Sequence, residues 1–403
     1  MHRREAEVSA MLEFDDVIAP LTRDQFFADH WGHSFLAAKG AAGRFSGLMD
    51  WDELNAILEQ HRLSPPRFRL TNEGRTIEPF RYMSPGPGGA PQLNSGKLAA
   101  CLSGGATLVL DCVEEMAPRV RTLAASFRDA LHAGNYVNLY AGWHSQNGLD
   151  LHWDSQEIMV LQLAGRKRWQ VYRPTRLNPL PDDLEPPPRP VAAPVWEGML
   201  EDGDMLYIPR GWWHVAFPVN EPSLHLTVAT VPPHGMDLLQ WIVGRLRRHE
   251  AVRADLPGLD DVRRQKAYLK TLRTLLAEAL ADDAISQFRR EWEGDLRPFP
   301  KIRLPDMPYV QVETLSDGHC IRLAAAHRLH FERNGTDMEF KAHGVLWGGL
   351  PPNLVKALEV LNDTHAVSFA ELSSRIDGDT AKAHLRQTLA ALARAGVVLV
   401  EKP

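Results

Sequence analysis

Near the start of the chain, apolar residues recur with the period of a helix. Residues 12–62 are consistent with helices joined by short connectors. Thr22–Phe27 and Asp50–Leu58 each begin with a residue that can cap a helix, followed by apolar positions spaced as on one helical face. The pattern therefore predicts an α-rich lead-in.

From about Phe68 the pattern changes to short alternating or wholly apolar runs separated by Gly, Pro and Asn. Such runs are typical of strands, and many short strands between turn residues indicate a barrel or sandwich. We expect one helix within this block, from Arg119 to His132. Residues 174–194 contain eight prolines and cannot form a regular central strand or helix, so they should be an excursion between strands. The predicted strands are 107–111, 136–140, 158–163, 168–172, 204–208 and 223–228.

Helical periodicity returns from Met236 to about Trp292, and again in a last block that begins at about Leu350. Leu238–Leu246 and Tyr268–Leu280 predict long amphipathic helices, which outside a β core often form a dimer or domain interface. The last block predicts three helices, a glycine and a strand, an order typical of a winged helix. These last elements are expected at 353–361, 369–376, 380–395 and 397–400.

The predicted architecture is thus mainly β with α, in three parts. Residues 1–235 would hold the lead-in and the β barrel, 236–298 a helical dimerisation region, and 299–403 a C-terminal domain with the winged helix. A length of 403 residues with 44% hydrophobic composition suits two or three domains.

Charge and cysteine content narrow the class of protein. The net charge of −6 gives no overall attraction to nucleic acid or an anionic membrane. Residues 342–403 hold six Lys/Arg and six Asp/Glu, which favours an interaction or structural role for the winged helix over DNA binding. Three cysteines without a CxxC pair indicate neither a disulfide framework nor a zinc-thiolate site. With no apolar signal core and no span of about 20 apolar residues, a cytoplasmic location is expected.

Three side chains have the spacing of a metal site. His152 and Asp154 are two residues apart, so on a strand both point to one face. Sixty-two residues after His152, a turn, a strand and a Pro-Arg-Gly bend lead to His214. Two imidazoles and one carboxylate make the facial triad of non-haem Fe(II) oxygenases, and the absence of thiolates disfavours structural zinc. The similar pair His330 and Glu332 lies outside the β-rich block, and we interpret it as polar surface or hairpin residues.

In the sequence, a lysine lies between the two halves of this motif. Lys167 follows the glycine turn at Gly165 and begins a returning strand. If its side chain faces the barrel interior, burial would cost several kcal/mol unless an anion pairs with it. The distal carboxylate of 2-oxoglutarate is a natural partner.

The run from about Asn138 to Thr230 resembles the JmjC-type, cupin-like ribosomal oxygenases. The matching positions are Asn138-Leu-Tyr140, His152-Trp-Asp154, Gly165-Arg-Lys167-Arg-Trp169, Ile208-Pro-Arg-Gly-Trp-Trp-His214 and His225-Leu-Thr227. The resemblance implies a double-stranded β-helix, followed by a helical dimerisation region and a winged helix.

The same resemblance implies roles for individual residues. His152, Asp154 and His214 would hold Fe(II), and O2 would be the second co-substrate. Lys167 and Tyr140 would bind the distal carboxylate of 2-oxoglutarate, with Asn138 and Thr227 as further cofactor-binding positions.

The implied reaction is hydroxylation of a histidine or arginine side chain in a protein such as a ribosomal protein, by a homodimer. Lysine at position 167 is more like the histidyl branch than the arginyl branch. Tailoring of a ribosomally made peptide or a small metabolite, and demethylation through the same C–H chemistry, stay open as alternatives. From another class, a non-catalytic cupin-like binding module or regulator also stays open.

Overall fold

The computed structural model divides the chain into two compact units, 1–232 and 233–403. It describes residues 11–183, 187–296, 299–302, 304, 311–312, 315–325, 327–363 and 366–401. The three-part division expected from the sequence stays a prediction.

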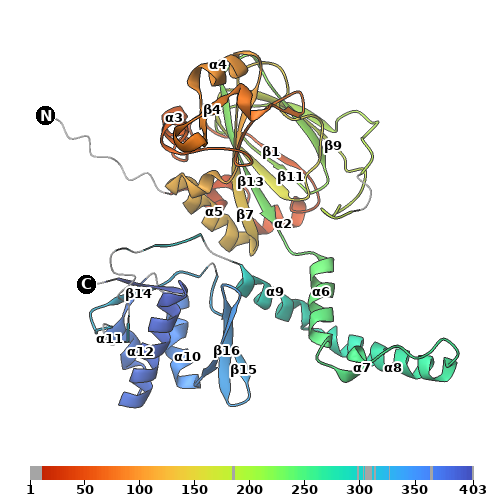
Figure 1. Ribbon diagram of the computed structural model, residues 1–403, viewed down its shortest axis with the longest axis vertical. Helices are drawn as coiled ribbons and strands as arrows, with labels where there is room; N and C mark the ends of the chain where they lie inside the picture. Colours follow the sequence, from red (N-terminus) through yellow and green to blue (C-terminus); the bar gives the residue numbers. More distant parts are fainter. Residues whose placement is uncertain are drawn as a thin grey trace. The chain divides into compact units, whose positions relative to one another are not determined.

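The first unit is a β barrel behind a short helical lead-in (Figure 1). Its larger sheet has eight strands in the order β1-β11-β8-β13-β7-β6-β2-β3, and a smaller sheet has the order β10-β9-β12. Pairing is antiparallel throughout both sheets. The strands are β1 (Leu36–Ala38), β2 (Phe68–Asn72), β3 (Arg75–Thr76), β4 (Met83–Pro85), β5 (Pro91–Leu93), β6 (Thr107–Leu110), β7 (Gly134–Gly142), β8 (Glu157–Ala164), β9 (Lys167–Tyr172), β10 (Trp196–Leu200), β11 (Met205–Ile208), β12 (Trp213–Pro218) and β13 (Ser223–Val231).

The predicted lead-in and the predicted helix inside the β block are both present. The helices of this unit are α1 (Phe14–Ile18), α2 (Arg23–Asp29), α3 (Trp51–Gln60), α4 (Ser95–Ser103) and α5 (Pro118–Leu131). Phe14 packs edge-on against Phe127 of α5, and Phe26 packs edge-on against Tyr207 of β11. These aromatic contacts fasten the lead-in to the outside of the barrel.

Strand β7 shows how alternation in the sequence divides the two faces of the sheet. Val137, Leu139 and Ala141 are fully buried, and α5 packs against this strand (Figure 1). The alternate residues Asn138 and Tyr140 point to the other face and line a cavity inside the barrel. One face of β7 therefore builds the core, and the other is free for chemistry.

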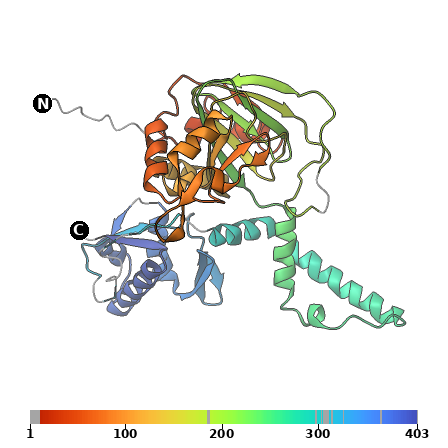
Figure 2. The ribbon, with the colours of Figure 1, turned by 45° about the horizontal axis from the view of Figure 1, so that its top comes forward.

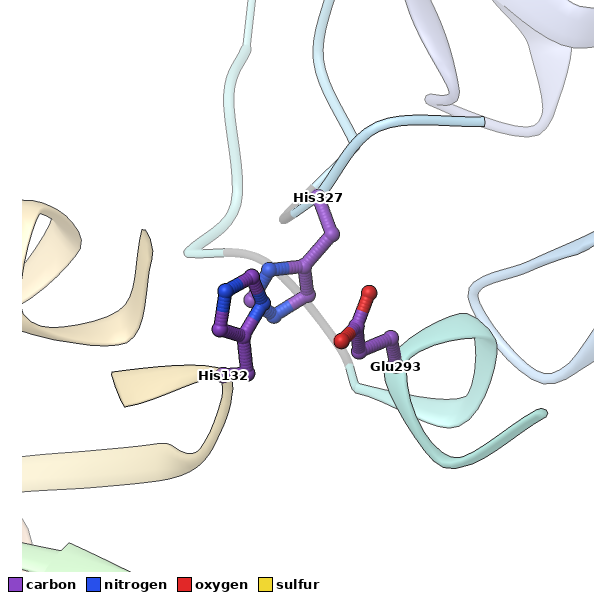
Figure 3. Close-up of side chains that lie close together, drawn as sticks. All are labelled: His132, Glu293 and His327. Carbon is purple, nitrogen blue, oxygen red and sulfur yellow. The ribbon is translucent and has the colours of Figure 1, made fainter. Parts of the chain in front are cut away.

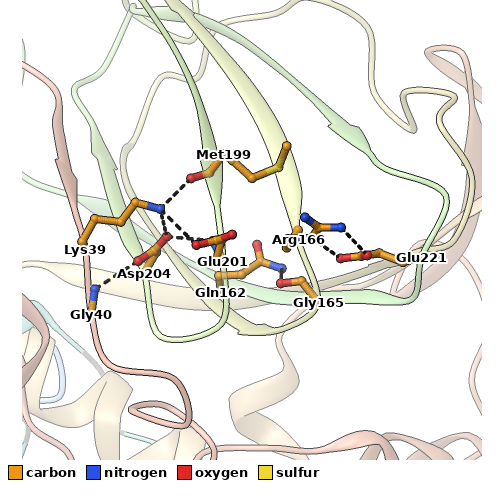
Figure 4. A network of polar contacts seen from close by, with 9 residues as sticks. All are labelled: Lys39, Gly40, Gln162, Gly165, Arg166, Met199, Glu201, Asp204 and Glu221. Carbon is orange, nitrogen blue, oxygen red and sulfur yellow. Dashed lines mark hydrogen bonds and ion pairs between the residues drawn. The ribbon is translucent and has the colours of Figure 1, made fainter.

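Two sets of polar contacts lie at the ends of barrel strands (Figure 4). The carboxylate of Asp204, 1% exposed, accepts hydrogen bonds from Lys39 Nζ at 2.7 Å and from the backbone N–H of Gly40 at 3.0 Å. At the β8–β9 turn, Arg166 Nε and Nη2 each donate to the carboxylate of Glu221 at 2.9 Å. The second contact fixes the turn immediately before Lys167.

The second unit begins with four helices and continues into a mixed α/β region. Its elements are α6 (Gly235–Leu246), α7 (Glu250–Arg253), α8 (Val262–Ala279), α9 (Ala284–Asp295), β14 (Cys320–Leu323), β15 (Glu332–Asn334), β16 (Asp337–Ala342), β17 (Val345–Leu350), α10 (Pro352–Glu359), β18 (Val367–Ser368), α11 (Phe369–Ser374), α12 (Asp379–Arg394) and β19 (Val398–Glu401). Helix α8 packs against α6 and α7 (Figure 2).

The helices and final strand predicted for the last block are present in the predicted order, with β18, β14 and β19 forming one sheet. Their interpretation as a winged helix stays a prediction. The β15-β16-β17 sheet was not predicted. In the described residues, no helix is both long enough and apolar enough to cross a membrane. The cytoplasmic location stays a prediction.

The sequence analysis interpreted His330 and Glu332 as polar surface or hairpin residues, and the structure agrees with that interpretation. His330 Nε2 lies 3.1 Å from the carboxylate of Glu293, and Glu332 begins β15 and pairs with Arg290 at 2.9 Å. Glu293 also faces His327 within the second unit (Figure 3). His132, the third residue labelled there, belongs to the first unit, where it follows α5 with a φ of 50°. In the described part of the chain, His330 belongs to no group of three side chains able to hold a metal.

The β8–β9 turn gives a direct test of how the fold positions Lys167. Gly165 has a φ of 64°, and a Cβ atom there would lie 1.9 Å from the carbonyl oxygen of Pro222. Gly165→Ala should lower the free energy of unfolding by about 2 kcal/mol or more, measured by urea denaturation. Gly96→Ala in α4 is the control, because its nearest neighbouring atom is 3.6 Å away. Equal effects of the two changes would contradict this account of the turn.

Candidate active site

The structure brings His152, Asp154 and His214 together in the first unit. His152 and His214 form an isolated antiparallel bridge, with N–H···O distances of 3.2 and 2.8 Å. Their ring centroids are 4.3 Å apart, and His214 Nε2 lies 3.4 Å from Asp154 Oδ2. One potential ligand atom from each of the three residues lies within 4.8 Å of the others. Backbone pairing thus joins two halves of the motif that are sixty-two positions apart in the sequence.

The hydrogen bonds of the two imidazoles define their protonation. His152 Nδ1 lies 2.7 Å from the carbonyl oxygen of Asp150, and His214 Nδ1 lies 3.1 Å from that of Trp212. A carbonyl oxygen only accepts, so each Nδ1 carries the proton and each Nε2 is left with a lone pair. Burial also lowers the pKa of His152, which favours its neutral form.

This tautomer places two acceptors opposite each other. The Nε2 lone pair of His214 faces the carboxylate of Asp154, an arrangement that needs a proton or a cation between the two atoms. Neutral imidazole and carboxylate donors suit a divalent transition metal such as Fe(II). The residues present therefore fit a metal ion.

Lys167 lies on β9 and faces the same cavity. Its side chain is 4% exposed, and among the described residues it has no hydrogen-bond or ion-pair partner. Burial lowers the pKa of Lys167 to about 7. An amine buried in this way is stabilised in its charged form only by an incoming anion.

All seven residues predicted for the site line one cavity of about 250 Å³. Beside Lys167, Tyr140 stacks on His225 with ring centroids 4.9 Å apart and an interplanar angle of 8°. Asn138 Oδ1 accepts a hydrogen bond from the backbone N–H of Cys112 at 3.3 Å. The predicted residues in the cavity wall are Asn138, Tyr140, His152, Asp154, Lys167, His214 and Thr227.

The structure adds residues that the sequence analysis did not assign to the site. Arg69 and Thr107 come from β2 and β6, ahead of the recognised motif. His225, a matching position of the resemblance, also lines the cavity; it is 2% exposed, and within the described residues its Nδ1 has no hydrogen-bond partner. The signal for Arg69 is the alternation in β2, where an arginine stands between the fully buried Phe68 and Leu70. Sequence alone does not tell which sheet that strand joins.

The proline-rich segment contacts residues that lie next to two of the candidate metal ligands. In its described residues, 174–183 and 187–194, it forms no helix or strand, as predicted. Trp213 Nε1 donates to Thr175 Oγ1 at 2.9 Å, and Arg189 pairs with Asp150 at 2.9 Å. Trp213 precedes His214, and the carbonyl of Asp150 holds His152. The segment therefore touches the immediate neighbours of two candidate ligands.

Comparisons with known proteins agree with this geometry. Residues 115–238 match the JmjC domain family, and this range includes the metal cluster, Lys167 and Tyr140. The chain is 27% identical over 227 residues to "Bifunctional lysine-specific demethylase and histidyl-hydroxylase NO66" of Drosophila persimilis, a match covering 53% of this chain and 31% of that protein. It is 29% identical over 235 residues to human ribosomal oxygenase 1, covering 54% and 34% of the two chains. The matches thus span about a third of the length of these relatives.

The fold is similar over nearly the whole chain to solved structures of the Escherichia coli ribosomal oxygenase YcfD. One has a TM-score of 0.57 at 20% identity, covering 95% of this chain and 98% of the other. Another, in complex with cobalt and 2-oxoglutarate, has a TM-score of 0.58 at 19% identity, covering 95% and 99%. The chain therefore has a JmjC/cupin-like fold with a JmjC domain, and its resemblance to the JmjC-type ribosomal oxygenase family is confirmed.

Proposed function

We propose that this protein is an Fe(II)- and 2-oxoglutarate-dependent oxygenase that hydroxylates a histidine or arginine side chain of a protein such as a ribosomal protein. The observation that supports it is a single cavity that contains two sets of polar groups without a binding partner. At one wall, His214 and Asp154 face each other as acceptors, and at another the Lys167 amine is buried with no partner among the residues that the structure describes. A divalent metal would bind between His214 and Asp154, and the distal carboxylate of 2-oxoglutarate would pair with Lys167.

In this proposal His152, Asp154 and His214 hold the metal. The carbonyls of Asp150 and Trp212 keep both Nε2 atoms unprotonated and directed at the cluster. When bound, Fe(II) with 2-oxoglutarate and O2 supplies the oxidising power that places oxygen into a C–H bond, and 2-oxoglutarate becomes succinate and CO2.

The remaining residues of the cavity bind and enclose the co-substrate. Lys167 contributes a charge-assisted hydrogen bond to the distal carboxylate, and the Tyr140 hydroxyl a second one. Burial raises the pKa of Tyr140, so its hydroxyl keeps the proton that it donates. Asn138 and Thr227 line the same wall, while Ile158 and Trp169 exclude water from the reacting centre.

Two observations support a catalytic role over a non-catalytic binding module. The cavity keeps a complete donor set for a metal and a separate cation for an anionic co-substrate. The relatives are named as an oxygenase and a histidyl-hydroxylase, and YcfD has been captured with 2-oxoglutarate. Tailoring of a peptide product or a small metabolite would use the same site, and the identity of the oxidised substrate separates these possibilities.

The first test is the visible charge-transfer band of an Fe(II)–2-oxoglutarate chelate under anaerobic conditions. The wild-type protein should develop the band, and His152→Ala and Asp154→Ala should lose it. Lys167→Ala should require at least tenfold more 2-oxoglutarate, because one charge-assisted hydrogen bond is lost. His330→Ala is the matched control, since His330 lies outside the cluster. Confirmed iron binding without a band would refute the 2-oxoglutarate assignment.

The lowered pKa of Lys167 predicts that 2-oxoglutarate binding depends on pH. Above a pKa of about 7 the free amine is neutral, yet the bound carboxylate requires the ammonium form. Binding must then take up a proton, so the Kd should rise by up to tenfold for each pH unit above 7 and level off below it. Lys167→Arg keeps its charge throughout and should flatten the profile. An equally steep rise in the arginine variant would assign the dependence to another group.

We further propose that the helices of the second unit form a homodimer interface. Met236, Leu239 and Val243 make one stripe on α6 and are 46, 50 and 59% exposed, while Ile242 on another face is buried. Helix α8 has 18 residues, and none of them is buried. Amphipathic helices of this kind are stabilised by a partner. The division at 236–298, and the winged helix in 299–403 as a substrate-presenting domain, belong to the same proposal.

Light scattering coupled to size-exclusion chromatography tests the interface. The wild-type protein should elute as a dimer, and Leu239→Glu with Val243→Glu should give a monomer, because two charges would be buried without partners. Leu259→Glu is the control, since Leu259 is 93% exposed and lies outside the helices. A monomeric wild-type protein would rule out the homodimer.

A further inference from the structure

Arg69 is a second fixed cation in the cavity wall, on the opposite sheet from Lys167. It lies in β2, which pairs with β6, and Arg69 is the register partner of Val109, which in turn pairs with Tyr140 of β7. Because directly paired residues share a face, this row points Arg69 into the barrel. Lys167 belongs instead to β9 of the three-stranded sheet.

The guanidinium of Arg69 is held from one side only. Its Nη1 donates to the carboxylate of Asp111 and, at 3.3 Å, to the carbonyl oxygen of Pro66. The side chain is 26% exposed, and in the described part of the chain Nε and Nη2 have no other hydrogen-bond partner. A rigidly held donor with unused N–H groups therefore faces the cavity.

The charges along the cavity wall are unequal. Arg69 is a permanent cation, Lys167 is the cation that pairs with 2-oxoglutarate in the proposed site, and Asp154 is the carboxylate among the described residues that line the cavity. Asp154 already faces His214 in the metal cluster. Asp111 lies outside the lining and is paired with Arg69. A positively charged substrate side chain would thus find no free carboxylate among these residues.

We propose that Arg69 determines substrate specificity by donating a hydrogen bond to a neutral imidazole, so that the site accepts histidine and rejects arginine. This inference rests on the proposed function and narrows its substrate class. A neutral imidazole has one acceptor nitrogen, whereas a guanidinium has five donors and no acceptor. Arginine would bring a second unpaired cation beside Arg69, since the charge of Lys167 is paired with 2-oxoglutarate in the proposed site, and its burial without a free carboxylate is costly.

A paired substitution separates recognition from folding. Removing Arg69 alone would leave Asp111 partly buried and unpaired, so we choose Arg69→Met with Asp111→Asn, which removes both charges at similar volume. Arg67→Met with Glu115→Gln is the matched control. Arg67, which directly precedes β2, forms an ion pair with Glu115; the two side chains are 40 and 45% exposed and do not line the cavity.

The probe is a pair of peptide libraries with randomised flanks and either histidine or arginine at the centre, incubated with full-length protein, Fe(II), 2-oxoglutarate and O2. Tandem mass spectrometry should find one added oxygen on the central histidine and none on the central arginine. For a selected histidine peptide, the paired variant should raise KM about tenfold or more, as expected for loss of one charge-assisted hydrogen bond. The Kd for 2-oxoglutarate should stay within about twofold, and the control pair should change neither value.

Three results would overturn the inference while the anaerobic chelate band is present. These are oxygen on the central arginine, no oxygen on the histidine library, or equal weakening of 2-oxoglutarate and peptide in the paired variant. The last result would place Arg69 at the co-substrate instead. An absent chelate band would overturn the proposed function, and this inference with it.

Discussion

The backbone bridge between His152 and His214 is the contact on which the site depends. Two N–H···O hydrogen bonds join segments sixty-two residues apart and hold the imidazole rings 4.3 Å from each other. Because the same segments also supply the carbonyls of Asp150 and Trp212, the bridge fixes both ring position and ring protonation. Geometry and electronic state of the cluster therefore come from one local arrangement of backbone.

The rest of the barrel keeps that arrangement in place. The Gly165 turn, held against Pro222 and tied by Arg166 to Glu221, sets where Lys167 begins its strand. The register of β9 with β12 then places Trp169 opposite Ala216, so both line the cavity wall. A residue far from the cluster can thus affect the site by moving a strand through one register position, since a slip of one residue reverses every side chain.

The sequence was most informative where the chemistry is local. His152 and Asp154 share a strand face, His214 follows a recognisable turn, and Lys167 follows a glycine, so their convergence could be predicted from spacing and from the family resemblance. Arg69 could not, because its place depends on β2 pairing with β6 and β6 with β7. Pairing between strands separated by about forty residues is a tertiary property that no local pattern encodes. The β15–β17 sheet was missed although β16 alternates polar and apolar residues, because its partners β15 and β17 are mostly exposed and have no such alternation.

The same polar groups that make the cavity suitable for ligands oppose the stability of the empty barrel. Within the described parts of the chain, the Lys167 amine and His225 Nδ1 are buried without partners, and the acceptors of His214 and Asp154 face each other across 3.4 Å. An apolar core of similar shape would be more stable, because each unsatisfied group retains a desolvation cost. A ligand that pairs with these groups in the folded state removes that cost, and it does not find them assembled in the unfolded chain. Binding and folding are therefore coupled here, and the barrel is most stable when its site is filled.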